Sequence, residues 1–433
     1  MLSINPQAQV LNDTINKNNP TILSLLSDRG KTIFFPKKGI LGQSAEAKGK
    51  QINATIGIAT DNNNEPLYLK SLQKNITQPP TDVYPYAPSY GLPALRKAWK
   101  EQLFTKNLSL AGKQFSLPIV TTGITHSLSL AGYLFINKED EIILPDLFWG
   151  NYKLIFQEAY GATLKTFTTF KDRKFNTQGL IKELENKGDK KVVLLNFPNN
   201  PTGYTPTKTE IKQIVQAIIK SASYGKQILV LIDDAYFGLV YKEDVEQQSL
   251  FSYLCDVHPN ILAVKLDGAT KEDYVWGFRV AFITYGAKTL TNEAYEALED
   301  KTAGALRGNI SSSSHLSQSL LLSAYKDPSY IKEKQAHHRL LESRFHAVEK
   351  TLSQHPEYQR YFKAYPYNSG YFMSLELNGE LDAEKVRQLL LDKYDTGVIA
   401  FENNIRVAFS AVPTISIPVL FTNMFSACQE LLK

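Results

Sequence analysis

The segment from 261 to 286 constrains this chain most, because it places two cations on a polar loop between two apolar runs. Both runs have the composition of buried strands. Lys271 lies in the loop, and Arg279 follows eight positions later. A desolvated lysine has a lowered pKa and can form a Schiff base with a carbonyl, and an arginine can hold a phosphate. A solvated loop with two surface cations explains this segment equally well on its own.

Length and composition narrow the class of protein. A chain of 433 residues favours two domains, and its 43% hydrophobic and 21% charged content is ordinary for a globular protein. The net charge of +5 is small and no dense basic cluster occurs, so we expect no nucleic-acid partner. Two cysteines cannot form a disulfide framework, which fits a reducing compartment. Without a signal-type segment or a run of about 18 apolar residues, we expect a cytoplasmic protein with no membrane partner.

Strand and helix patterns alternate from about 85 to 315, and a mixed region follows. This order predicts an α/β fold with a mainly parallel central sheet flanked by helices, plus a smaller α+β domain. Before it, we expect a short helix at 20–26, irregular chain at 31–50 and a short strand within 51–61 that ends at Gly57.

Three further features suit a ligand site. The strand at 117–121 leads through Gly123 into a helix, and such a helix start can bind phosphate, although most such turns bind nothing. Asp233 and Asp234 end an apolar strand, where open α/β sheets place ligand chemistry. A turn or cap role explains Asp234 but leaves Asp233 without a partner. The loop residue Trp149 packs either on the core or on a flat ligand ring.

Taken together, five landmarks resemble the aspartate-aminotransferase-like superfamily, the fold-type I pyridoxal-phosphate (PLP) enzymes of aminotransferase class I/II. They are TGIT at 122–125, the aromatic loop at 148–152, NNPTG at 199–203, DDAY at 233–236 and the Lys271–Arg279 pair. The resemblance covers about 52–406. It implies pyridoxal 5'-phosphate as cofactor, a large PLP-binding domain at 85–315, and a small domain built from 51–84 and 316–433. Residues 1–50 are then an N-terminal arm.

The resemblance also implies roles for single residues. Lys271 holds the cofactor as an internal aldimine, whereas Lys265 lacks the eight-residue spacing to an arginine. Asp233 faces the pyridine nitrogen, and a buried anion there keeps that nitrogen protonated and the ring an electron sink. Tyr236 and Asn200 donate hydrogen bonds to the phenolic oxygen, which favours the phenolate.

Further cofactor contacts follow from the same resemblance. Trp149 stacks on the ring, Gly123, Ile124 and Thr125 form the phosphate cradle, Arg279 pairs with the phosphate, and Tyr86 reaches the phosphate of a neighbouring subunit. The Tyr86 contact implies a homodimer with active sites at the subunit interface. Two positions depart from the family pattern: Ala269 stands where a phosphate-binding serine is usual, so that Thr270 or Ser311 compensates, and Ala281 stands where glycine is favoured.

Substrate contacts are implied as well. Arg406 grips the substrate α-carboxylate, for which a planar guanidinium is suited, although a surface arginine on an edge strand is the alternative. Gly57 and Asn200 lie against the substrate. Arg307 and Ser311 resemble the element that reaches into a neighbour's site, where the arginine reads a side-chain carboxylate and the serine touches phosphate. Arg307 equally suits a helix C-terminus.

We therefore expect a PLP-dependent aminotransferase that moves an amino group from an L-amino acid to a 2-oxo acid by a ping-pong mechanism, with no metal. The nearest alternative is another reaction of the same cofactor, such as C–S β-elimination or decarboxylation, because fold and cofactor do not separate these. A third hypothesis is that the chain is an effector-sensing domain of a transcription regulator. It requires a DNA-binding module, and residues 1–50 show no helix-turn-helix pattern.

Overall fold

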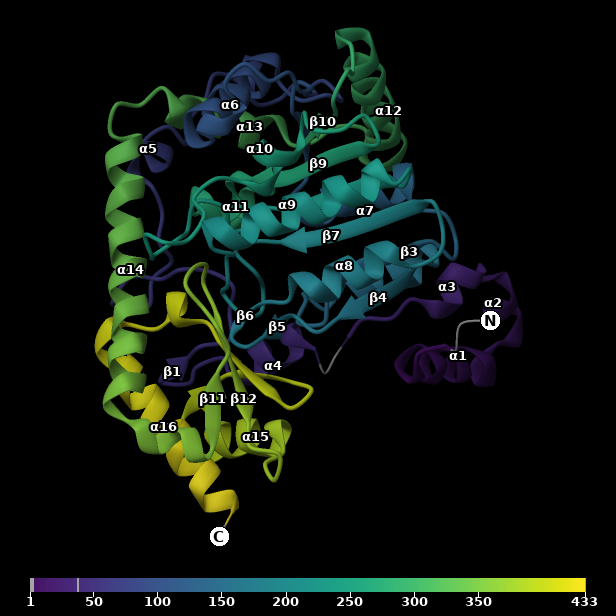
Figure 1. The fold of residues 1–433 in the computed structure, drawn as a ribbon. Coiled ribbons are helices and arrows are strands. Elements are labelled where there is room, and N and C mark those ends of the chain that lie inside the picture. The colour runs from purple at the N-terminus through teal and green to yellow at the C-terminus, as the bar shows by residue number, and fades with distance from the viewer. Residues whose placement is uncertain (1–3, 37–38, 433) are drawn as a thin grey trace.

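A seven-stranded sheet forms the centre of the computed structural model, which describes residues 4–36 and 39–432 (Figure 1). Its order is β2-β10-β9-β8-β7-β3-β4, with strands β2 (Ile119–Thr121), β3 (Glu141–Pro145), β4 (Thr163–Phe167), β7 (Lys190–Asn196), β8 (Gln227–Asp233), β9 (Ile261–Gly268) and β10 (Ala281–Gly286). All neighbouring pairs from β4 to β9 are parallel, and β10 is antiparallel to β9 and β2. The predicted α/β fold with a mainly parallel sheet is confirmed.

The central strands end in polar residues at one edge of the sheet. β7 and β8 are buried from their second residue onward, as expected for parallel strands covered on both faces. Asn196 and Asp233 are their last residues and lie opposite each other in the pairing register. Asn196 Nδ2 donates to the Asp233 carbonyl oxygen at 2.7 Å. The carboxyl edge of the sheet therefore collects the polar groups, as in other open α/β sheets.

Helices pack along this sheet (Figure 1). They are α6 (Pro93–Lys106), α7 (Ile124–Phe135), α8 (Thr177–Glu185), α9 (Lys208–Ser223), α10 (Leu250–Leu254), α11 (Ala269–Glu272), α12 (Asn292–Ile310) and α13 (His315–Tyr325). Most of them were predicted from the sequence, but α10 and α11 were not, and the segment that forms α11 was predicted as part of a polar loop. α9 begins with a capping box between Thr207 and Glu210, which satisfies two backbone donors at the helix start.

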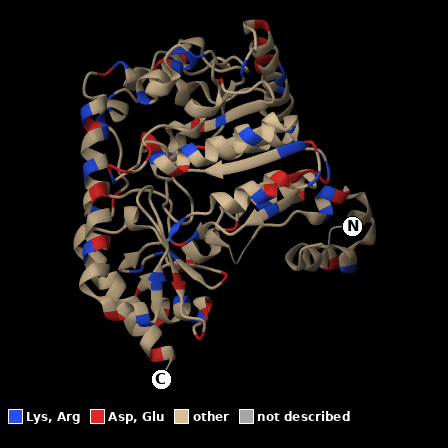
Figure 2. Cartoon of the chain, viewed as in Figure 1, with Lys and Arg blue, Asp and Glu red and all other residues tan. Residues whose placement is uncertain are grey.

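A second, antiparallel sheet has the order β11-β12-β15-β14, with β11 (Phe362–Ala364), β12 (Met373–Leu377), β14 (Ile399–Phe401) and β15 (Asn404–Val407). α15 (Ala383–Tyr394) and α16 (Ile417–Leu431) accompany it, and α14 (Tyr330–Gln354) runs past both sheets (Figure 1). Basic and acidic residues are interspersed along α14 (Figure 2). β1 (Ile52–Asn53) pairs in parallel with β13 (Thr396–Gly397), which joins the early chain to this region.

The first 50 residues are more helical than predicted. α1 (Pro6–Asn18), α2 (Pro20–Leu25) and α3 (Asp28–Thr32) stand away from both sheets (Figure 1), and only α2 was expected. The irregular chain predicted at 31–50 is wrong for α4 (Ile40–Glu46); positions 37 and 38 lie outside the described residues. The strand predicted within 51–61 is limited to Ile52–Asn53. α5 (Lys70–Gln73) lies between β1 and α6 in the chain. None of the helices in the described part of the chain combines the length and the apolar composition that a membrane span requires.

Candidate active site

A cavity of about 330 Å³ lies at the carboxyl edge of the large sheet. It is lined by segments far apart in the chain, from α4 to β15. Ten of the residues predicted from the sequence line it: Gly57, Ile124, Thr125, Trp149, Asn200, Asp233, Tyr236, Lys271, Arg279 and Arg406. The strand ends and helix starts described above thus bring most of the predicted residues to one place.

Lys271 lies in α11, immediately after the buried strand β9. Burial lowers its pKa to about 8, the nearby Asp233 carboxylate opposes this, and the positive charge of Arg279 adds to it. The Nζ atom is 5.1 Å from the centre of the Tyr236 ring, and Tyr371 Oη donates to the Lys271 carbonyl oxygen at 3.0 Å. The amine is therefore neutral in a large fraction of molecules near pH 8, the form that attacks carbonyls.

The turn after Lys271 is held by a half-buried ion cluster. Lys106 Nζ lies 2.5 Å from Glu272 Oε1, and Lys334 Nζ lies 2.8 Å from Asp273 Oδ1. Because these carboxylates directly follow Lys271, the cluster ties α11 to α6 and α14 and restrains the lysine backbone.

Asp233 is 3% exposed and has the partner that the sequence did not reveal. Tyr152 Oη donates to its Oδ2 at 2.6 Å, and the Ala235 N–H donates to its Oδ1 at 3.1 Å. Burial raises the pKa of Asp233, while the Tyr152 hydrogen bond and the charge of Lys271 act to lower it. Tyr152 was missed because its only signal was its place in the aromatic loop, three residues after Trp149.

Lys265 is placed quite differently from Lys271. It is fully buried and forms ion pairs with Asp234 and with Asp267, whose Oδ2 lies 3.3 Å away. These carboxylates raise the pKa of Lys265 despite the burial of its amine, which alone would lower it. Lys265 is therefore a structural cation, whereas Lys271 faces the cavity.

The Arg279 guanidinium lies against Gly123, where α7 begins. Gly123 has φ +81, and a Cβ atom built there would lie 2.2 Å from Arg279 Nη2, so glycine lets the guanidinium lie against the helix start. Thr270 Oγ1 lines the same cavity, is buried and has no hydrogen-bond partner among the described residues. A partnerless buried hydroxyl needs an explanation, and a bound phosphate beside Arg279 and the α7 amides supplies one.

Arg406 lies on β15, between β12 and β14, and is 3% exposed, so it is not a surface arginine on an edge strand. Its Nη2 donates to the Thr55 carbonyl oxygen at 2.9 Å and its Nη1 to Asn200 Oδ1 at 3.2 Å. The buried Nε has no partner among the described residues. Burial lowers the pKa of Arg406 to about 10. A buried, incompletely paired guanidinium is suited to a carboxylate ligand.

Four predicted residues do not line the cavity. Gly123 lies behind it, against Arg279. Tyr86 is 90% exposed, and Arg307 and Ser311 are exposed at the end of α12. The roles predicted for Tyr86, Arg307 and Ser311 therefore need a second subunit, whereas Thr270 already lies in the cavity.

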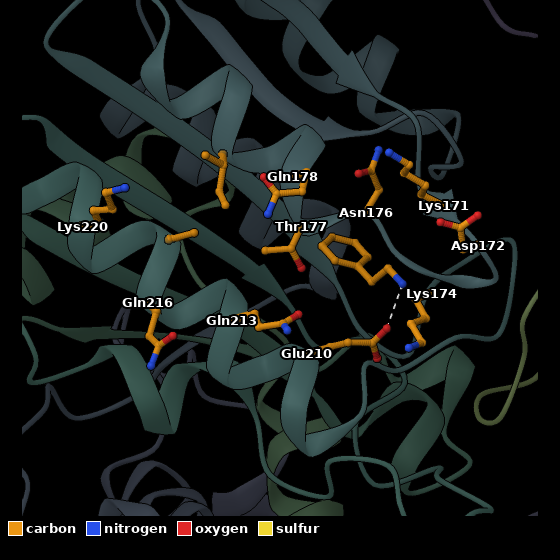
Figure 3. Close-up of a pocket in the computed structure, with 13 residues that line it drawn as sticks. Lys171, Asp172, Lys174, Asn176, Thr177, Gln178, Glu210, Gln213, Gln216 and Lys220 are labelled. Carbon is orange, nitrogen blue, oxygen red and sulfur yellow. Dashed lines mark hydrogen bonds between the residues drawn. The ribbon is translucent and has the colours of Figure 1, made fainter.

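A different hollow, of about 520 Å³, lies between α8, α9 and the hairpin of β5 (Phe170–Lys171) and β6 (Lys174–Phe175) (Figure 3). Its buried carboxylate, Glu210, accepts hydrogen bonds from the Phe175 N–H at 2.8 Å, from Tyr204 Oη at 2.7 Å and from the Thr207 N–H at 2.7 Å. Since these bonds satisfy Glu210 and the predicted site residues lie elsewhere, the cavity at the sheet edge is the candidate active site.

Comparisons with known proteins agree with the family resemblance inferred from the sequence. The family model described as aminotransferase class I and II matches residues 50–418. The aspartate aminotransferase of Bacillus sp. (strain YM-2) is 26% identical over 266 residues, which are 60% of this chain and 63% of that protein. The probable N-acetyl-LL-diaminopimelate aminotransferase of Bacillus subtilis is 29% identical over 49% of each chain. The chain thus spans about half to two thirds of the length of the curated relatives it matches.

Solved structures share the fold across nearly the whole chain. An aminotransferase from Anaerococcus prevotii has a TM-score of 0.81 at 22% identity and covers 93% of this chain and 99% of its own. The kynurenine aminotransferase of Pyrococcus horikoshii, in complex with PMP, has a TM-score of 0.78 at 16% identity and covers 95% and 98%. Because the family model matches most of the sequence, this chain belongs to the aminotransferase class I and II family.

Proposed function

We propose that this chain is a PLP-dependent aminotransferase that moves an amino group from an L-amino acid to a 2-oxo acid. One observation carries the proposal: a single cavity contains Lys271, whose pKa is lowered to about 8, the buried carboxylate of Asp233, and the buried guanidinium of Arg406. An amine, an anion for a ring nitrogen and a receptor for a carboxylate are the groups that such a reaction requires.

The residues present fit pyridoxal 5'-phosphate. The partnerless hydroxyl of Thr270, the guanidinium of Arg279 and the amide end of α7 suit its phosphate. The carboxylate of Asp233 suits a protonated ring nitrogen, and the half-buried Trp149 offers a flat face at the cavity wall.

When bound, the cofactor supplies an aldehyde carbon for attachment to an amine and a ring that accepts electrons from the bonds around that carbon. Separate residues of the chain bind the substrate, transfer the proton and donate a hydrogen bond. Arg406 binds and orients the substrate carboxylate. The amine of Lys271, with its lowered pKa, accepts the proton from the substrate Cα and then acts as the proton donor in the next step. Burial raises the pKa of Tyr236, so its hydroxyl stays protonated and serves as a hydrogen-bond donor.

The test of this proposal is the form of the cofactor after one amino acid has reacted. Purified protein loaded with PLP is mixed with an amino acid, the small molecules are released, and pyridoxamine phosphate is measured by mass spectrometry together with the matching 2-oxo acid. Equal amounts of both support transamination. A 2-oxo acid or amine formed repeatedly while the cofactor stays PLP would identify an eliminating or decarboxylating enzyme.

We also propose a homodimer and a cytoplasmic location. Support for the dimer comes from three residues predicted to act across an interface, Tyr86, Arg307 and Ser311, which are all exposed in the single chain. A division into an arm (1–50), a large domain (85–315) and a small domain (51–84 with 316–433) is proposed with it. The strands of the large sheet fall between 119 and 286, and β1 pairs with β13, which supports that division.

A further inference from the structure

Arg344 is a fully buried arginine on α14 that lies outside the cavity. Its guanidinium donates to the Ser410 carbonyl oxygen, to the Asp61 carbonyl oxygen at 3.1 Å and to Asn62 Oδ1 at 3.4 Å. Burial lowers the pKa of Arg344 to about 10, and the nearby charge of Asp61 opposes this. Because a buried cation held by neutral oxygens is costly, the choice of these partners needs an explanation.

The two segments that Arg344 joins both border the candidate active site. The loop 54–61 supplies three residues of the cavity lining, Ile56, Gly57 and Ile58. The segment 406–410 begins with Arg406, the proposed receptor of the substrate α-carboxylate. Arg344 contacts the far end of each segment, at Asp61 and at Ser410. It therefore lies where the two segments meet, behind the groups that face the cavity.

Hydrogen bonds join the loop 54–61 to the segment 406–410 along their length. The acceptors are four carbonyl oxygens: that of Ala54 from the Ala408 N–H at 2.8 Å, that of Thr55 from Arg406 Nη2 at 2.9 Å, that of Ile58 from Ser410 Oγ at 2.8 Å and that of Ser410 from the Thr60 N–H at 3.1 Å. The Ser410 carbonyl oxygen thus accepts from the loop and from Arg344, which its two lone pairs allow. Arg344 fixes the end of this paired region.

The same region is connected to the turn of Lys271. The Ser410 N–H donates to the Tyr371 carbonyl oxygen at 3.3 Å, and Tyr371 Oη donates to the Lys271 carbonyl oxygen at 3.0 Å. α14 also reaches this turn directly, because Lys334 Nζ lies 2.8 Å from Asp273 Oδ1. The helix that holds the carboxylate receptor in place therefore holds the reactive amine as well.

We propose, resting on the proposed function, that Arg344 is a positioning residue for substrate binding. Through the backbone oxygens that it binds, it holds Arg406 and the loop 54–61 in the arrangement that receives an α-carboxylate. Arg344 lines no part of the cavity, so its loss weakens the binding of the substrate and leaves the binding of PLP intact. Since Arg344 and Ser410 are fully buried within one chain, a second subunit at the cavity does not replace their contacts.

The first measurement is amide hydrogen exchange, followed by mass spectrometry, in the full-length protein without cofactor. In Arg344→Met we expect the peptide that covers 54–61 to exchange at least about tenfold faster, because the acceptor of the Thr60 N–H is no longer fixed, while peptides from β8 stay unchanged. If Arg344→Met does not fold, Arg344→Lys takes its place, since it keeps the charge and lacks the planar fork. Unchanged exchange at 54–61 in a folded variant overturns the inference.

A pair of serine variants tests the same paired region without removing a charge. Ser410→Ala removes the 2.8 Å hydrogen bond to the Ile58 carbonyl oxygen. Ser252→Ala is the matched control, because Ser252 is also fully buried and its Oγ donates to the Ser249 carbonyl oxygen at 2.8 Å, away from the cavity. We expect faster exchange at 54–61 in Ser410→Ala only. Equal exchange there in both variants contradicts the inference.

The kinetic test uses PLP-loaded protein and the common amino acid that discharges the visible cofactor band fastest. For Arg344→Met we expect KM to rise roughly tenfold while kcat stays within about threefold and the dissociation constant of PLP is unchanged. Because Arg344 acts through Arg406, kcat/KM of the double variant should equal that of Arg406→Lys alone.

Two kinetic results would overturn the inference: multiplied losses in the double variant, which mean that the two arginines act independently, or weaker PLP binding in Arg344→Met. If no amino acid discharges the band of the unmodified protein, the proposed function itself fails. The exchange rate at 54–61 then still decides whether Arg344 holds this loop.

Discussion

Tyr152 donates a hydrogen bond to Asp233, with 2.6 Å between Oη and Oδ2, deep in the protein. The bond joins the aromatic loop that follows β3 to the last residue of β8. Because both partners are buried, the phenol holds the carboxylate in one orientation and favours its charged form. Asp233 is therefore held in one orientation at the cavity, and Tyr152 is a positioning residue for it.

Removal of that hydroxyl tests the relationship. In Tyr152→Phe the ring remains and the hydrogen bond to a charged group is lost, a change of about 1.5–3 kcal/mol. We expect PLP to bind roughly tenfold or more weakly, with the pH at which binding is lost on acidification moved upward. Tyr90→Phe is the control, because Tyr90 Oη makes the same 2.6 Å bond to Asp300 outside the cavity. Equal effects in the two variants would exclude a specific role for Tyr152.

A methyl group on Gly123 tests the anion site. Gly123→Ala brings a Cβ within 2.2 Å of Arg279 Nη2, so the guanidinium must move away from the start of α7. We expect inorganic phosphate and PLP to bind at least about tenfold more weakly, which is ~1.4 kcal/mol. Gly112→Ala is the matched control, because Gly112 also has a positive φ (+76) but has nothing within 4 Å of the added carbon. If both variants bind phosphate equally, Arg279 does not belong to the anion site.

The lowered pKa of Lys271 predicts a pH-dependent stability in cofactor-free protein. The folded state loses this proton near pH 8, whereas an unfolded lysine keeps it to about pH 10.4. Between these values the unfolded state binds more protons, so the contribution of Lys271 to the free energy of unfolding rises with pH. The free energy of unfolding is measured by urea denaturation at pH 7, 8.5 and 10 for the unmodified protein and for Lys271→Met. As the pH rises, the unmodified protein should become more stable relative to Lys271→Met. The exposed Lys332→Met is the control, and a difference for Lys271→Met that stays constant with pH contradicts the prediction.

The fork geometry of Arg406 should matter for the substrate and not for the cofactor. Arg406→Lys keeps a positive charge but cannot bind a carboxylate with two parallel hydrogen bonds. We expect KM for the amino donor to rise roughly 10- to 100-fold, as for the loss of a hydrogen bond between charged groups, with PLP affinity unchanged. Steady-state kinetics and a PLP titration measure the two effects. Loss of PLP binding with an unchanged KM would place Arg406 at the cofactor instead.

The proposed interface can be tested by mixing inactive subunits. Lys271→Ala lacks the catalytic amine, and Tyr86→Ala lacks the residue proposed to reach the neighbouring site. A hybrid dimer contains one site with Lys271 from one chain and Tyr86 from the other, so unfolding and refolding the two variants together should restore part of the activity. If the mixture stays as inactive as its components, Tyr86 does not act across an interface.

The sequence predicted the parts of the fold that depend on local pattern. The middle parts of β7 and β8 are continuous apolar runs, and α6 and α9 repeat their apolar residues with helical spacing, so each was recognisable alone. α4 was not, because Gly39 gives its start no side-chain cap. Gln43 holds α4 through two 2.8 Å bonds to the backbone of Ala400, a distant contact that no local pattern shows.

The candidate site also contains residues that the sequence predicted and residues that it did not. Lys271, Asp233, Asn200 and Arg279 stand in short motifs with fixed spacing, and the structure brings their side chains to one cavity. Tyr152 stands in the aromatic loop at 148–152, but its role depends on where that loop meets the end of β8, which no local pattern shows. Ile56 was included in the short strand predicted to end at Gly57, but pairing with β13 stops at Asn53 and Ile56 lines the cavity.

The most direct test of the account is to identify the amine that holds the cofactor. Full-length protein is incubated with PLP, reduced with borohydride and digested, and the modified lysine is located by peptide mass spectrometry. We predict a single pyridoxyl adduct on Lys271, absent from Lys271→Ala and undiminished in an exposed-lysine control such as Lys332→Ala. An adduct on Lys265 or on surface lysines, with Lys271 unmodified, would contradict it.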